Sequence, residues 1–81
     1  MRKMDYHKAK ANPFATGIIP DGYYGNFAEV GFHFDKQSGK TVCVALCGCF
    51  LFGIPPAIDA NEALWLIKNH PTSNARQVVA L

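Results

Sequence analysis

The sequence predicts an α+β fold in which a small antiparallel sheet, a hairpin with a candidate third strand, packs on one main helix in the rough order ββαβ. Apolar side chains alternate along residues 27–34 and again along residues 41–47, with a polar loop between the two runs. Such alternation is typical of half-buried strands joined as a hairpin. A helix start signal follows at Asp59. A chain of 81 residues has room for one domain of this kind.

The amino-terminal end predicts a basic arm over residues 1–12, followed by a single compact α+β domain over residues 13–81. The basic side chains of the arm are Arg2, Lys3, Lys8 and Lys10, set against one acid. Such an arm can steer an acidic partner toward the protein. Residues 12–26 are rich in glycine and proline, so we expect a turn-rich lead-in there.

The hairpin is predicted in detail by side-chain type. Alternation places Ala28, Val30, Phe32 and Phe34 on one face and Phe27, Glu29, Gly31 and His33 on the other. Glu29 and His33 are expected to be solvated. Gly39 fits a left-handed turn position in the loop over residues 35–40. On the second strand the small side chains of Cys43, Ala45 and Cys47 would share a face on which a helix can pack closely.

Residues 41–58 contain no charged side chain, which raises the alternative of a membrane-spanning segment. Pro55 and Pro56 shorten the usable run to residues 42–54, which is too short to cross a bilayer as a helix. Gly48 and Gly53 weaken a helix further. We therefore expect buried strands, with a bend at Gly48 before residues 49–52. Since residues 1–11 also lack the apolar core of a signal peptide, the predicted location is cytoplasmic, with no membrane partner.

The clearest helix signal begins at Asp59, a good N-cap with Glu62 three residues later. The core-facing positions recur at helical spacing at Ala60, Ala63, Leu64 and Ile67. Trp65 is predicted near the edge of this apolar stripe. Pro71 ends the helix because it disfavours helix at the preceding residue. Residues 75–81 form either a third strand or a second short helix, and their two adjacent valines favour the strand.

No pattern predicts catalysis or a cofactor. Cys43, Cys47 and Cys49 are an odd number of closely spaced thiols, which indicates reduced cysteines in a reducing compartment. On a strand, Cys43 and Cys47 would lie about 13 Å apart, too far to share a metal. Glu29 and His33 could line a cleft but lack a recognisable catalytic setting. The predicted protein is non-enzymatic, with no metal and no cofactor.

Excess aromatic surface for so small a chain predicts a binding function. We expect a protein partner, contacted by Tyr23, Tyr24 and Trp65 with help from the basic arm. Size and layout further resemble phage or mobile-element inhibitors of host defence complexes, including those of anti-CRISPR type. The alternative is a single-stranded nucleic-acid-binding module that uses an aromatic sheet face and the arm. Homodimerisation through Phe50, Phe52 or an open sheet edge is compatible with either function.

Overall fold

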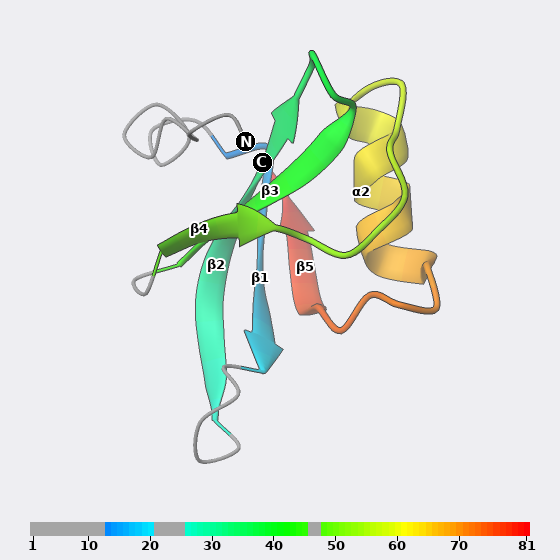
Figure 1. Cartoon of the computed structure of the whole chain (residues 1–81). Coiled ribbons are helices and arrows are strands. Elements are labelled where there is room, and N and C mark those ends of the chain that lie inside the picture. The colour runs from blue at the N-terminus through cyan, green and yellow to red at the C-terminus, as the bar shows by residue number, and fades with distance from the viewer. Residues whose placement is uncertain (1–12, 21–25, 46–47) are drawn as a thin grey trace.

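An antiparallel sheet with one helix packed against it forms the described part of the chain (Figure 1). The computed structural model describes residues 13–20, 26–45 and 48–81. Its elements in chain order are β1 (Ala15–Pro20), β2 (Phe27–Asp35), β3 (Lys40–Ala45), β4 (Gly48–Leu51), α2 (Ala60–Asn69) and β5 (Arg76–Ala80). The predicted α+β class is confirmed, and the sheet is larger than the predicted hairpin with one added strand. In the same described residues, no helix is long and apolar enough to cross a membrane.

The strand order is β4-β3-β2-β1-β5, and each neighbouring pair is antiparallel. The predicted hairpin is β2 and β3, which meet at the Asp35–Lys40 pair. The strands β1 and β5 come from opposite ends of the described chain yet lie side by side, with Ala15 opposite Ala80. Just beyond this pair, the Leu81 N–H donates to the Phe14 carbonyl over 3.0 Å.

The prediction of a turn-rich lead-in over residues 12–26 is wrong for residues 15–20, which form the strand β1. Ala15, Gly17 and Ile19 alternate as buried residues on one face of β1. Gly17 has a packing role, because a Cβ there would lie 3.2 Å from the Phe32 ring and 3.2 Å from the Arg76 carbonyl oxygen. The glycine that resembled a turn signal instead lets β1 approach its neighbours closely.

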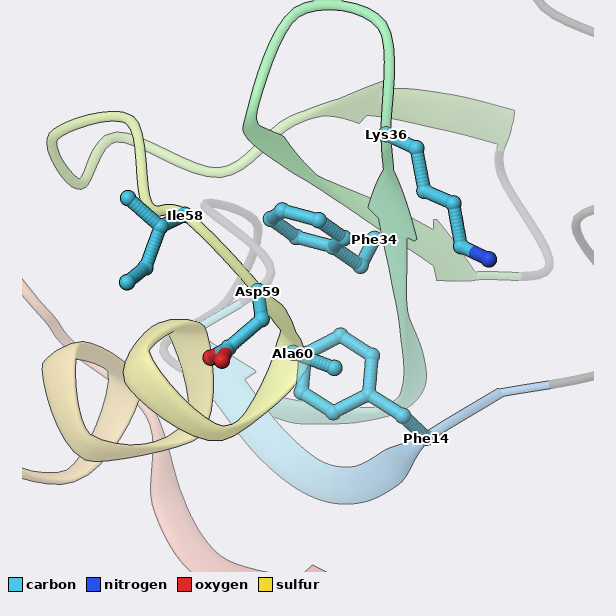
Figure 2. Close-up of a pocket in the computed structure, with 6 residues that line it drawn as sticks. All are labelled: Phe14, Phe34, Lys36, Ile58, Asp59 and Ala60. Atoms are coloured by element: carbon cyan, nitrogen blue, oxygen red, sulfur yellow. The ribbon is translucent and has the colours of Figure 1, made fainter.

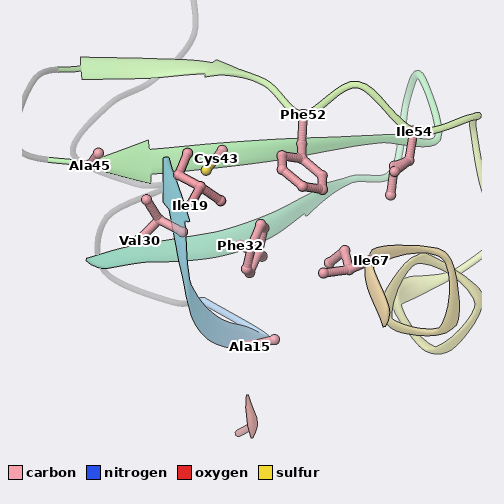
Figure 3. Packing of buried hydrophobic residues seen from close by; sticks show 9 residues of the cluster. All are labelled: Ala15, Ile19, Val30, Phe32, Cys43, Ala45, Phe52, Ile54 and Ile67. Carbon is pink, nitrogen blue, oxygen red and sulfur yellow. The ribbon is translucent and has the colours of Figure 1, made fainter. Parts of the chain in front are cut away.

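The core lies between the sheet and α2 (Figure 3). The Phe32 and Phe52 rings meet edge to face with centroids 5.1 Å apart, and Ile67 of α2 points toward them. Cys43 and Ala45 of β3 belong to the same buried cluster. The small side chains of β3 therefore share the core with the helix, as predicted for these two residues, while Cys47 lies outside the described residues.

Local signals set the ends of α2. The Asp59 Oδ1 accepts a hydrogen bond from the Glu62 N–H over 2.8 Å, which confirms the predicted N-cap. At the other end the His70 N–H donates to the Leu66 carbonyl, and His70 itself is extended. Pro71 follows, so the predicted end of the helix is also confirmed.

The carboxy-terminal element is a strand, as predicted from its two adjacent valines. The strand β5 pairs with β1, and the register shifts between Thr16 and Ile18. Gln77 has a φ of 52°, in the left-handed region that non-glycine residues rarely occupy. A bulge of this kind increases the local twist of an edge strand.

Candidate functional site

The most exposed aromatic group in the described chain is Trp65, on the outward side of α2. Its side chain is 61% exposed, whereas Ala63 and Ile67 are fully buried. With about 100° of rotation per helical residue, Trp65 lies roughly opposite the side formed by Ala63 and Ile67. The prediction that Trp65 lies near the edge of the apolar stripe is therefore wrong. Leu64 and Leu66, which pack against the core on either side of Ala63 and Ile67, flank the buried side of the helix, and Trp65 lies on the opposite side.

Polar groups surround Trp65 on the same side of the helix. Asn61, one turn before it, and Lys68 and Asn69, after it, are all exposed. The Asn69 side-chain amide donates to the Trp65 carbonyl oxygen over 2.9 Å. An exposed tryptophan within a polar rim has the layout of a protein-interface anchor, in which a large ring is dehydrated and its surroundings exclude water.

A pocket of about 410 Å³ opens at the beginning of α2 (Figure 2). The rings of Phe14 and Phe34 belong to its apolar lining, and Lys36 and Asp59 are its charged residues. Ile58, at the edge of this pocket, is 84% exposed. The pocket therefore offers an apolar surface flanked by one positive and one negative group, and it could accept an apolar side chain of a partner.

Most of the predicted contact residues lie outside the described part of the chain. These are Tyr23 and Tyr24 and the basic residues Arg2, Lys3, Lys8 and Lys10. Of the predicted set, the structure describes Trp65 alone. The pocket residues Phe14 and Ile58 were not predicted, since neither lies in a recognisable pattern and only folding brings them to the same place.

The aromatic residues of β2 do not form one exposed face. Phe32 is fully buried and cannot stack on a base, whereas Phe27 is 46% exposed. The Arg76 guanidinium lies over the Phe27 ring, 5.2 Å from its centroid. This cation–π contact covers part of the ring that would otherwise be free for stacking.

The residues considered for chemistry are spread over the sheet. His33 is 8% exposed, so the prediction that it is solvated beside Glu29 is wrong. It lies on the face opposite α2, where its cross-strand neighbour Val42 is also buried. Glu29, four residues away on β2, is exposed. A buried imidazole and a solvated carboxylate do not line a common cleft.

The two described cysteines point to opposite faces of the sheet. Cys43 is buried in the core, while Cys49 of β4 pairs with Val44 on the other face. Burial raises the pKa of the Cys49 thiol, which favours its neutral form. Within residues 13–20, 26–45 and 48–81, no three His, Cys, Asp or Glu side chains come close enough together to hold a metal ion.

Comparisons with known proteins give no further assignment. No family model matches the chain, and no curated protein or solved structure matches it either. The candidate site therefore rests on its own geometry, which consists of the exposed Trp65 ring, its polar rim and the pocket at the start of the same helix.

Proposed function

We propose that this protein is a non-enzymatic binding module whose partner is another protein, contacted through the outward side of α2. The observation that carries the proposal is the exposure of Trp65 on a helix whose opposite side is fully buried. A tryptophan left in water forgoes the stabilisation that burial of its large apolar surface would give. That stabilisation becomes available when a partner covers the ring.

The pocket supports the same proposal because it adds a second contact point at the beginning of the helix. Its apolar lining and its two oppositely charged residues suit a protein side chain with a polar neighbour. Trp65 would insert into the partner, and the partner would insert a side chain between Phe14 and Phe34. The narrower proposal, a phage or mobile-element inhibitor of a host complex, rests on an analogy of size and layout alone.

Replacing Trp65 with alanine tests the proposal directly. The immobilised protein is incubated with a nuclease-treated lysate from a plausible host. The partner that it retains is identified and purified, and its affinity is then measured by titration. If Trp65 is the anchor, Trp65→Ala lowers the affinity by roughly thirtyfold or more, since anchor residues contribute about 2 kcal/mol or more. The fold should be unchanged because the ring contributes little to the core.

A matched control is Val79→Ala, which shortens an apolar side chain that is also exposed but belongs to the edge strand β5. This variant should bind like the wild type. Equal affinities for Trp65→Ala and the wild type would contradict the proposal. Binding that disappears after nuclease treatment, or falls steeply with added salt, would favour the nucleic-acid alternative.

A further inference from the structure

Among the described residues, no strand lies beside the outer edge of β4, and β4 itself carries no charge. β4 is the last strand on its side of the sheet, and its residues are Gly48, Cys49, Phe50 and Leu51. Phe50 is 41% exposed and Leu51 is 50% exposed. An open edge with exposed apolar side chains is a template for pairing with a further strand.

The opposite edge carries the protection that β4 lacks. There β5 has a charged residue, Arg76, and a bulge marked by the positive φ of Gln77. A bulge and a charged side chain both hinder the addition of a strand. The strand β4 contains no charge and no proline, and its register with β3 is unbroken. The contrast between the two edges singles out β4 as the edge that can pair.

The hydrogen-bond pattern shows which groups are available on β4. The Phe52 N–H donates to the Thr41 carbonyl, so this pair belongs to the hydrogen-bonded set of the β3–β4 ladder. In an antiparallel ladder such pairs alternate with pairs whose backbone groups point away. Phe50 therefore bonds toward β3, while the N–H and C=O groups of Cys49 and Leu51 point outward. No hydrogen bond to a described residue satisfies these outward groups.

We propose that β4 pairs with β4 of a second copy of this chain, in antiparallel register about a two-fold axis at Phe50. In this register Cys49 lies opposite Leu51 of the second copy, and Leu51 lies opposite its Cys49, so all four outward groups on each strand are hydrogen-bonded. A register centred on Cys49 or on Leu51 would instead set one of these two residues opposite a position outside β4 of the second copy. The second copy also suits the edge because two uncharged strands meet without repulsion.

The same register brings the two Phe50 rings together. They face each other in a non-hydrogen-bonded pair, the arrangement in which cross-strand side chains lie closest. Both rings lie on the face of the sheet that carries α2, since Phe50 pairs with the core residue Cys43. The pairing closes on itself, because each copy uses its open edge and keeps the protected β5 edge outside. The contact is small, so the dimer is expected to be weak and concentration-dependent.

Mass measurement by light scattering or sedimentation over a wide concentration range tests the proposal. The wild type should move from the 8.9 kDa monomer toward twice that mass as its concentration rises. Phe50→Lys should remain monomeric throughout, because two ammonium groups would face each other across the axis. Val79→Lys places the same charge on the β5 edge and should dimerise like the wild type.

A second variant guards against a folding defect in Phe50→Lys. Leu51→Pro removes an outward N–H and no bond to β3, so it should fold and also remain monomeric. The register is tested by Phe50→Cys in a Cys49→Ser background, which should form an intermolecular disulfide on mild oxidation, while Val79→Cys in that background should not. A wild type that stays monomeric at its highest soluble concentration would overturn the proposal. A dimer that survives both Phe50→Lys and Leu51→Pro would overturn it equally.

Discussion

Gly39 lies in the turn between β2 and β3 and contacts Ala57 in the loop that precedes α2. Its φ of +72° lies in the left-handed region, and a Cβ there would lie 2.7 Å from the Ala57 carbonyl oxygen. Its own carbonyl accepts a hydrogen bond from the Ala57 N–H over 2.7 Å. The residue therefore satisfies two demands at once, a turn conformation and a close backbone contact.

We expect Gly39→Ala to lower the free energy of unfolding by at least about 1–2 kcal/mol. The left-handed conformation alone costs an L-residue about that much, and the added methyl group must also displace the Ala57 carbonyl. Urea denaturation followed by circular dichroism gives the change in midpoint. Gly53→Ala is the matched control, since a Cβ there meets nothing within 4 Å; it should change stability by less than about 0.5 kcal/mol. Equal losses for the two variants would contradict this account of Gly39.

At the scale of single residues, the sequence predicts what depends on near neighbours in the chain. Gly39 and Asp59 are recognisable because a turn and a helix cap are specified within a few residues. The orientation of Trp65 is different, since its helix carries apolar residues on more than one side. Contact with the sheet decides which of these sides becomes the core, and no local pattern contains that information.

The helix α2 depends on its first turn, where Asp59 is the N-cap. The Asp59→Ala substitution should destabilise the protein by about 1 kcal/mol, because the Glu62 N–H loses its side-chain acceptor. Thermal unfolding measures the loss. Asp59→Asn keeps an acceptor oxygen at the same place and should restore most of the stability. If Asp59→Asn were as unstable as Asp59→Ala, the carboxylate charge rather than the hydrogen bond would be the stabilising feature.

The strand β1 shows why elements are harder to predict than caps. Its residues 15–20 include Gly17 and Pro20, two residue types that usually indicate turns. In the structure Gly17 is buried between neighbouring strands, and Pro20 is the last residue of β1. Both residues are compatible with a strand once the neighbouring strands are known. The pairing of β1 with β5 is decided by residues from the other end of the described chain.

The molecule as a whole has one small core, so each large buried ring matters. Phe32→Ala should cost about 3–5 kcal/mol, the usual cost of removing a fully buried phenylalanine side chain. A small domain has only about 5–15 kcal/mol of stability in total. We therefore expect this variant to lose a large part of its stability, measured by circular dichroism as a melting temperature and a urea midpoint well below those of the wild type.

Phe27→Ala is the control on the same strand. This ring is exposed and contacts Arg76, so its removal should cost less than about 1 kcal/mol. If Phe27→Ala were as damaging as Phe32→Ala, the assignment of the core to the face that carries α2 would be wrong. The same comparison measures how much each of these two rings contributes to the free energy of unfolding.

The candidate site was only partly predictable at this scale. Trp65 could be named as a contact residue from its size and its place on an amphipathic helix. The pocket could not be named, because Phe14, Phe34 and Ile58 come from three separate segments that only the folded sheet and helix bring together. The sequence predicts that the sheet has an open edge, but it does not predict that β4 forms this edge. The strand order decides which strand is outermost.

The neighbouring positions of β1 and β5 have a consequence for synthesis in the cell. During translation β1 emerges early and β5 late, so the sheet can form from β1 to β4 while β1 still lacks its second neighbour. For that interval the described strands have two edges without a neighbouring strand, and the β1 edge from Ala15 to Ile18 is closed later, when β5 pairs with it. Long-range pairing of this kind slows folding and prolongs exposure to aggregation. A holding chaperone that covers the open edge of β1 during that interval would therefore benefit the yield of this protein more than it would benefit a fold closed by local hairpins.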